Sequence, residues 1–224
     1  MKFPGPPPLP RLRFQVSEFT LTCKTGEWYT FRNATAGAPP MMVATTQEDA
    51  ASVPAFLEKV SLGVGWDFAE DDRLHLGASV VALNDKNGFI GHVHLGNESD
   101  FCGAIEYCID SLSDAGSGHD EVINLNLGEL PPRVWRLACF VNCHSNKKLS
   151  RARSAYVRLF VGQHTLGFQR LTEIVDSVGM FFCLLQRNSA GAWFFQTVVR
   201  PVSGAFVGDS YSDIVKILGE IPLF

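Results

Sequence analysis

The sequence lacks an excess of basic charge. Its 224 residues contain 19 lysines and arginines against 23 aspartates and glutamates, so the formal net charge is −4 at pH 7. Proteins that bind nucleic acid usually carry a whole face of basic side chains. The densest basic grouping, Lys147 and Lys148 with Arg151 and Arg153, is short and is typical of a solvated loop. The composition therefore predicts no nucleic-acid partner.

Paired cysteines and long hydrophobic runs are also missing. None of the six cysteines forms a Cys-x-x-Cys motif, and Cys139 and Cys143 lie in an apolar run where cysteine behaves as a small hydrophobic residue. A disulfide framework or a zinc site is therefore not expected, and a reducing compartment fits best. No segment is long and apolar enough to cross a membrane, and residues 1–8 are too rich in proline for a signal peptide. We expect a cytoplasmic protein.

The sequence contains no recognisable catalytic motif. It has neither a Walker A loop nor a complete Gly-x-Gly-x-x-Gly motif; the Gly-Val-Gly at 63–65 is a fragment that lies within a strand-like run. His92 and His94 are two residues apart on an expected strand, so both side chains point to one face. Such a pair could chelate a transition metal with a third ligand, but it more often lines a sheet surface. Cys143 and His144, as neighbours on a strand, would point to opposite faces and form no dyad. We expect no enzymatic activity.

What the sequence does contain is a series of short strand-like segments separated by turns. Residues 122–127 place Ile123 and Leu125 on one face and asparagines on the other, which is typical of a strand with one buried face. Residues 134–143 are apolar on both faces, as expected of a central strand. Further strands are expected at 59–66, 74–83, 89–95, 104–109, 155–161, 164–174, 180–186 and 193–199, and a short helix at 210–218 with Ser210 as its N-cap. The pattern predicts an all-β fold, an antiparallel two-sheet β-sandwich with a short C-terminal helix and an extended N-terminal arm.

The first 55 residues are predicted to form an extension of the main domain, residues 56–224. Residues 1–10 contain five of the twelve prolines and indicate an extended polyproline arm, which is either a loose tail or a segment that lies along a protein partner. Residues 14–23 and 28–31 are expected to be two strands joined by a turn, and residues 33–46 a loop. The arm is the expected contact with protein partners, and the oligomeric state stays open.

Two acidic, glycine-containing loops are the strongest indication of chemistry. One carries Asp67 and three further acids at positions 70–72; the other carries Asp110, Asp114, Asp120 and Glu121 among glycines and serines. Calcium takes about six to eight oxygen ligands, which loops of this kind can supply from carboxylates and carbonyls. Acidic surface loops are also common in proteins that bind no metal, so the residues alone leave both interpretations open. Neither loop matches the EF-hand pattern.

Three segments carry a resemblance to a known family, and their order and spacing are specific when taken together. They are Val-Ser-Leu-Gly-Val-Gly-Trp-Asp at 60–67, Leu-Gly-Ala-Ser at 76–79 and Gly-His-Asp-Glu-Val-Ile-Asn-Leu-Asn-Leu at 118–127. With them, the chain from about residue 59 to residue 218 resembles the TerD domain family, the tellurium-resistance and general stress proteins of bacteria. The resemblance implies a β-sandwich that binds two calcium ions in loops at one end.

The chain departs from that family where calcium ligands are expected. The family usually has Asp-x-Asp-Ala-Ser on the second strand, whereas this chain has histidine and glycine at positions 75 and 77. Asp110, Asp120 and Glu121 match family acids, and Asp67 follows the first strand. These four are the candidate metal ligands. Since calcium affinity follows the number of charged ligands, the loss of two acids is expected to weaken the site.

Two functional hypotheses follow from these observations. The first is a TerD-like calcium-binding module of the stress response, in which calcium orders one end of the sandwich and the protein interacts with other proteins. The alternative is a structural subunit of a larger assembly, built on a metal-free TerD-like sandwich and held by its N-terminal arm. Calcium binding distinguishes the two.

Overall fold

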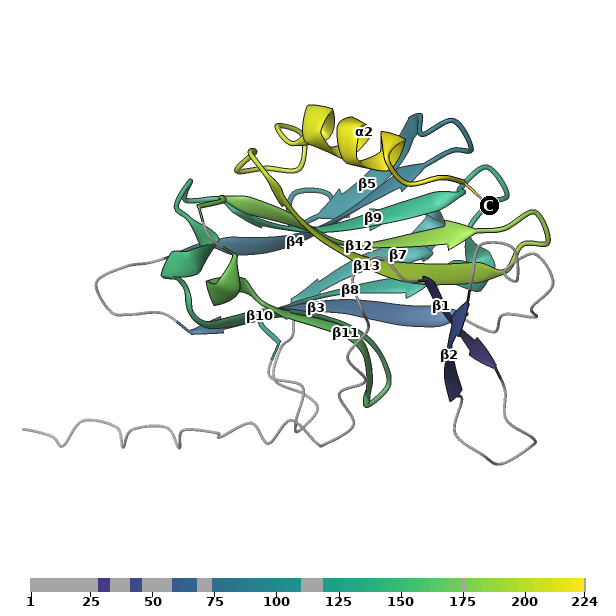
Figure 1. Cartoon of the computed structure of the whole chain (residues 1–224), viewed down its shortest axis with the longest axis horizontal. Helices are drawn as coiled ribbons and strands as arrows, with labels where there is room; N and C mark the ends of the chain where they lie inside the picture. Colours follow the sequence, from purple (N-terminus) through teal and green to yellow (C-terminus); the bar gives the residue numbers. More distant parts are fainter. Residues whose placement is uncertain are drawn as a thin grey trace, which may run out of the picture.

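The computed structural model describes residues 28–32, 41–45, 58–67, 74–109, 119–174 and 176–223. Within these ranges the chain forms two antiparallel sheets stacked face to face, with one α-helix on the outer side of the larger sheet (Figure 1). The predicted antiparallel β-sandwich with a short C-terminal helix is confirmed.

The two sheets differ in size and in what covers them. Sheet A has seven strands in the order β2-β1-β13-β12-β9-β4-β5, and sheet B has six in the order β11-β10-β3-β8-β7-β6. In sheet A the strands are β1 (Trp28–Arg32), β2 (Met41–Thr45), β4 (Leu76–Leu83), β5 (Phe89–His94), β9 (Arg136–Cys143), β12 (Gly179–Arg187) and β13 (Trp193–Val202). In sheet B they are β3 (Lys59–Asp67), β6 (Ser99–Asp100), β7 (Ile105–Ile109), β8 (Glu121–Asn126), β10 (Arg153–Val161) and β11 (His164–Arg170). Short 3₁₀ segments lie at Phe101–Gly103, Leu127–Glu129, Leu149–Arg151 and Leu171–Glu173.

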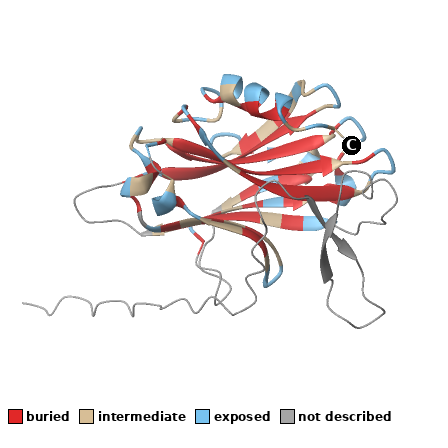
Figure 2. Cartoon of the chain, viewed as in Figure 1, coloured by how far each residue is buried: buried red, intermediate tan, exposed pale blue. Residues whose placement is uncertain are grey.

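The main hydrophobic core lies between the sheets. Strand β8 contributes Ile123 and Leu125, which are almost fully buried, whereas Asn124 between them is exposed. Strands β4 and β9 are buried along their whole length and supply residues to both faces of sheet A. Figure 2 shows this contrast between the continuously buried central strands of sheet A and the mixed strands of sheet B. A sheet that is buried on both faces needs a second layer, and the C-terminal helix provides it.

Helix α2 (Tyr211–Gly219) covers the outer face of sheet A and forms a second hydrophobic cluster there. Ile214, Ile217 and Leu218 are buried at a helical spacing that places them on one side. Ser210 occupies the predicted N-cap position, but its hydroxyl makes no cap hydrogen bond. Within the described ranges, no helix is long and apolar enough to span a bilayer.

Arg136 fixes the C-terminal end of this helix. Its side chain is fully buried at the start of β9. The guanidinium donates to the carbonyl oxygen of Ile221 at 2.8 Å, to Oε1 of Gln186 at 2.7 Å and to Oδ1 of Asn87 at 2.9 Å. Burial lowers the pKa of Arg136 to about 10. A cation near the last carbonyls of a helix is a favourable arrangement, so this residue joins sheet A to α2.

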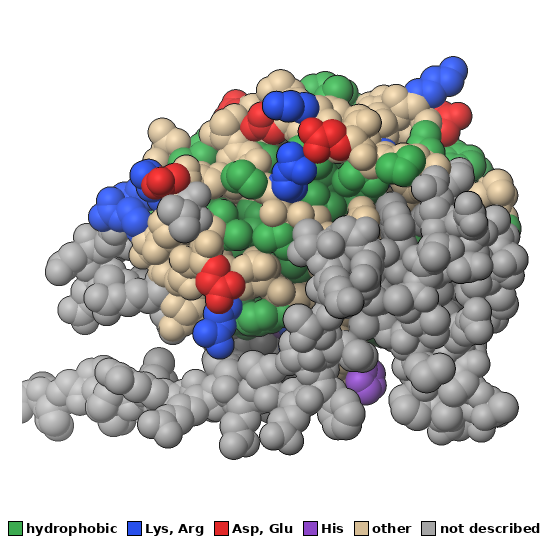
Figure 3. Space-filling view, in the orientation of Figure 1, with side chains coloured by type: hydrophobic (Ala, Val, Ile, Leu, Met, Phe, Trp, Pro, Cys, Tyr) green, Lys and Arg blue, Asp and Glu red, His purple; other side chains and the backbone are tan. Residues whose placement is uncertain are grey.

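The surface carries both signs of charge. On the face drawn in Figure 3, lysine and arginine side chains lie beside aspartates and glutamates. Arg200 and Glu220 form one such ion pair, with charged atoms 3.1 Å apart. Among the described residues on that face, mixed charge of this kind gives no extended basic field.

The N-terminal part differs from the sequence-based expectation. Residues 33–46 were expected to form a loop, but Met41–Thr45 is strand β2, which pairs antiparallel with β1. Strand β1 also pairs with β13, so this hairpin extends one edge of sheet A. Met41–Thr45 lacks the alternation that marks an amphipathic strand, which is why the pattern was missed. The expected arm at 1–10 and strand at 14–23 lie outside the described residues, and the domain boundary at residue 56 stays a prediction.

Candidate metal centre

The strand register brings the predicted ligand positions to one end of sheet B. Strand β8 lies between β3 and β7, and Glu121 at its start is paired with Val64 on one side and Ile109 on the other. Strand β3 ends at Asp67, three residues beyond Val64. Strand β7 ends at Ile109, and Asp110 follows it in the chain. The end of β3 at Asp67, the end of β7 at Ile109 and the start of β8 at Glu121 therefore lie at the same edge.

Asp120 is tied to the end of β3. It is exposed, and its backbone N–H donates to the carbonyl oxygen of Val64 at 2.8 Å. Its carboxylate oxygen Oδ2 accepts a hydrogen bond from the backbone N–H of Trp66 at 2.7 Å. Trp66 immediately precedes Asp67. The side chain of Asp67 and the whole of Asp110 lie outside what the structure describes, so their roles as ligands stay predictions.

Glu121 points into the sandwich, on the same face of β8 as the buried Ile123. Its side chain is 6% exposed, and Oε2 accepts a hydrogen bond from the backbone N–H of Ala78 at 2.7 Å. Ala78 belongs to β4, so this carboxylate connects the two sheets. The hydroxyl of Tyr107 also hydrogen-bonds to it. Glu121 is thus fixed in position from both sheets.

The electrostatics of Glu121 are those of a buried acid beside a second acid. Burial is the main cause that raises the pKa of Glu121, and the negative charge of Asp120 adds to it. The hydrogen bonds from Ala78 and Tyr107 act in the opposite direction. Burial, with the charge of Glu121, also raises the pKa of the Tyr107 hydroxyl. Two carboxylates at adjacent positions favour a nearby positive charge.

Glycine and histidine form two close contacts near this edge. A Cβ placed on Gly63 of β3 would lie 2.2 Å from Cδ2 of His119, whose ring stacks on Phe160 with centroids 4.9 Å apart. A Cβ on Gly77 of β4 would lie 2.4 Å from Cε1 of His144. Each imidazole therefore fills space that a side chain on the glycine would need. Sequence reasoning missed both contacts, although glycine inside a strand is a signal of close approach.

The described residues supply only part of a calcium site. Asp120 and Glu121 offer carboxylate oxygens, but calcium needs about six to eight oxygens. Within the described part of the chain, no group of three or more His, Cys, Asp or Glu side chains is placed to hold a metal ion. On β4, Gly77 has no carboxylate and Ala78 provides an N–H donor. The remaining acids of the two loops, at 70–72 and at 114, lie outside the described ranges.

Comparison with known proteins gives the family. Residues 43–208 match the TerD domain. The chain is 30% identical to the tellurium resistance protein TerZ of Serratia marcescens over 173 residues, covering 71% of this chain and 89% of that protein. It is 28% identical to general stress protein 16U of Bacillus subtilis over 116 residues, covering 46% of this chain and 58% of that protein.

A solved structure shares the same fold. It is the crystal structure of a homologue of telluride resistance protein TerD from Streptomyces coelicolor, with a TM-score of 0.59, 22% identity and coverage of 66% of this chain and 91% of that chain. The two sheets, the match over residues 43–208 and the similarity to TerZ agree, and the chain belongs to the TerD family.

Proposed function

We propose that this protein is a non-enzymatic TerD-family module of the stress response that binds calcium at the β3–β7–β8 edge of sheet B and interacts with other proteins. The observation that supports this proposal is the strand register, which sets Glu121 at the start of β8 between the last residues of β3 and of β7. Relatives of the chain are tellurium resistance and stress proteins by name, which supports the same broad role.

Asp120 and Glu121 are the ligands we propose among the described residues. Trp66 and Ala78 each donate a backbone N–H to one oxygen of these carboxylates, which orients the side chains. Asp67 and Asp110 are the proposed further ligands. Bound calcium would supply a positive charge that joins segments of β3, β7 and β8, so that this edge becomes ordered for a partner.

We propose a cytoplasmic location as well. Cys139 and Cys143 are buried in the core and form no disulfide. Free, buried thiols are at home in a reducing compartment, where disulfides are rare.

One observation favours the alternative, a metal-free structural subunit. The ring of His144 occupies the space next to Gly77, where the family pattern places an acid. Glu121 is already held by Ala78 and Tyr107. In this second proposal the sandwich is a scaffold, and residues 1–13 hold it in its assembly.

Calorimetry of the chelator-treated full-length protein tests the two proposals. The calcium-module proposal predicts heat on calcium addition with a dissociation constant of about 10⁻⁷–10⁻⁵ M, the range of sensor sites. At a hundredfold excess over that constant, calcium should stabilise the fold by about 2.7 kcal/mol. Magnesium serves as the control ion.

Variants identify the site. Glu121→Gln keeps an oxygen for the Ala78 N–H but loses the charge, and it should abolish calcium binding. Asp213→Asn removes an acid from helix α2 on the other sheet and should leave binding unchanged. No heat and no stabilisation at millimolar calcium would refute the module and favour the scaffold, for which deletion of residues 1–13 should release the protein from its complex.

A further inference from the structure

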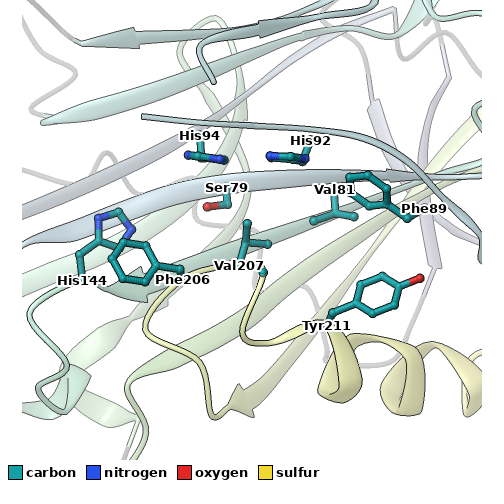
Figure 4. A pocket seen from close by; sticks show the side chains of 10 residues that line it. Ser79, Val81, Phe89, His92, His94, His144, Phe206, Val207 and Tyr211 are labelled. Atoms are coloured by element: carbon teal, nitrogen blue, oxygen red, sulfur yellow. The ribbon is translucent and has the colours of Figure 1, made fainter. Parts of the chain in front are cut away.

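A pocket lies on the outer face of sheet A, between β5 and the start of α2. Its volume is about 230 Å³. Ser79 and Val81 of β4 form its floor, and His92 and His94 of β5 form one wall (Figure 4). These β4 residues alternate with Ala78 and Val80, which face the main core, so the pocket is separate from the core between the sheets and from the carboxylate of Glu121.

Aromatic side chains complete the pocket and are unusually exposed. Phe206 is 53% exposed, Phe89 48% and Tyr211 40%. Phe206 stacks on the ring of His144 with centroids 4.7 Å apart. Phe89 and Tyr211 meet edge to face at 6.4 Å. Large aromatic side chains that surround a hollow and stay exposed are typical of a binding surface.

His94 presents a fixed hydrogen-bond donor. Its Nδ1 accepts a hydrogen bond from the backbone N–H of Gly96 at 2.9 Å. A neutral imidazole that accepts at Nδ1 carries its proton on Nε2. The rings of His92 and His94 are stacked, with centroids 4.9 Å apart and planes 5° apart. Because Nδ1 of His94 is occupied and Nε2 is protonated, this arrangement suits a ligand that accepts a hydrogen bond better than a metal ion.

The pocket has a polar end and an apolar end. Ser79 is directly opposite His94 in the β4–β5 register. Figure 4 places these two residues with His144 at one end, whereas Phe89, Val81 and Tyr211 lie toward the other. A ligand that fits both ends has one hydrogen-bond-accepting group and an apolar body.

The described lining of the pocket carries no negative charge that would repel an anion. Burial, and then the neighbouring His92, lower the pKa of His94. Burial, followed by His94 and His75, lowers the pKa of His144. Among the residues that the structure describes, the titratable side chains that line the pocket are His92, His94, His144 and Tyr211, and none of the lining residues is an acid. An anion would stabilise the protonated form of His144, so its binding should be coupled to proton uptake there.

We propose that this pocket binds a small aromatic carboxylate. The carboxylate would accept hydrogen bonds from His94, Ser79 and His144, and the ring would lie against Phe89, Val81 and Tyr211. A cavity of about 150 Å³ is enough to hold benzene, so about 230 Å³ accommodates a benzene ring with a carboxylate. The proposal is independent of the calcium site, because it depends on none of the acids at the edge of sheet B.

Titration of the full-length, chelator-treated protein with 4-fluorobenzoate, followed by ¹⁹F NMR, tests the proposal. We expect saturable binding that strengthens at least threefold from pH 8 to pH 6. The neutral 4-fluorobenzamide should bind at least tenfold more weakly, and so should inorganic phosphate, which has no ring.

Variants and a direct contact measurement complete the test. His94→Leu and His144→Phe, which keeps a ring against Phe206, should each weaken binding at least fivefold, and His164→Gln on β11 should not. Intermolecular NOEs from the ligand ring to Phe89 and Tyr211 in the unaltered protein would locate the ligand without any variant.

Other results would overturn the proposal. They are equal affinity for 4-fluorobenzoate and 4-fluorobenzamide, binding that none of the pocket variants changes, or NOEs to residues outside the pocket. Zinc binding that depends on His92 and His94, with no response to 4-fluorobenzoate, would make the cluster a metal site and would likewise refute it.

Discussion

Replacing Arg136 by leucine should lower the free energy of unfolding by about 3 kcal/mol. The guanidinium makes three hydrogen bonds of 2.7–2.9 Å, to Gln186, Asn87 and Ile221. A hydrogen bond that involves a charged group contributes about 1.5–3 kcal/mol, which gives about 4.5–9 kcal/mol for the set. Burial lowers the pKa of Arg136 to about 10, so the buried cation carries a desolvation cost that leucine removes. The net loss should therefore be smaller than that sum.

Urea unfolding measures this loss as a lower midpoint at an unchanged slope. Hydrogen exchange should accelerate in α2, because Arg136 holds the carbonyl of Ile221 just beyond the helix. In Arg136→Leu, Oε1 of Gln186 is buried and has lost its donor. The double variant Arg136→Leu/Gln186→Leu removes this oxygen and should recover part of the stability.

The matched control is Arg200→Leu. Arg200 pairs with Glu220 at 3.1 Å, but their side chains are 48% and 49% exposed, and exposed ion pairs contribute about 0–1 kcal/mol. If Arg136→Leu were no more destabilising than Arg200→Leu, the role assigned to Arg136 in joining sheet A to α2 would be refuted.

Three further substitutions have predicted outcomes. Burial raises the pKa of Glu121, so the unaltered protein should lose stability as the pH rises and this buried carboxyl ionises. In the absence of metal, Glu121→Gln should therefore become more stable relative to the unaltered protein as the pH rises. Urea midpoints at several pH values measure this difference. Asp213→Asn should lower the free energy of unfolding by about 1 kcal/mol at neutral pH, since the N–H and hydroxyl of Ser203 each donate to the carboxylate at 2.7 Å. These hydrogen bonds lower the pKa of Asp213, so the difference in stability between the two proteins should disappear in acid. Gly63→Ala should lower the free energy of unfolding by at least about 2 kcal/mol, because its Cβ would lie 2.2 Å from Cδ2 of His119.

Each of these outcomes can fail. If the stability of Glu121→Gln and of the unaltered protein changed equally with pH, burial of the Glu121 carboxylate would cost no stability. A constant Asp213→Asn difference from pH 7 to acid would exclude a charge effect. A Gly63→Ala protein as stable as the unaltered one would mean that the ring of His119 moves freely.

Much of the fold was predictable because local patterns determine it. The alternation of Ile123 and Leu125 with asparagines located β8, and the apolar run at 134–143 located the central strand β9. Strand β2, Met41–Thr45, was not predictable in this way, because its place depends on pairing with β1 rather than on a pattern of its own.

The candidate site was predictable only in part. Asp120 and Glu121 were recognised from a short motif, and the register places them at one edge with the end of β3. The aromatic pocket was not foreseen, although His92 and His94 were expected on one face. Its other walls include Phe206 and Tyr211, which lie more than a hundred residues further along the chain and approach β5 only because α2 packs on sheet A.

The contact between Gly77 and His144 also restricts the order in which substitutions can accumulate in this protein during evolution. An aspartate at position 77 could not be accommodated unless the ring of His144 first left its place against Phe206. Conversely, a small residue at 144 would leave a gap beside a bare glycine. The two positions are 67 residues apart in the sequence yet must change together, so a descendant could regain an acid on β4 only by a route that passes through position 144.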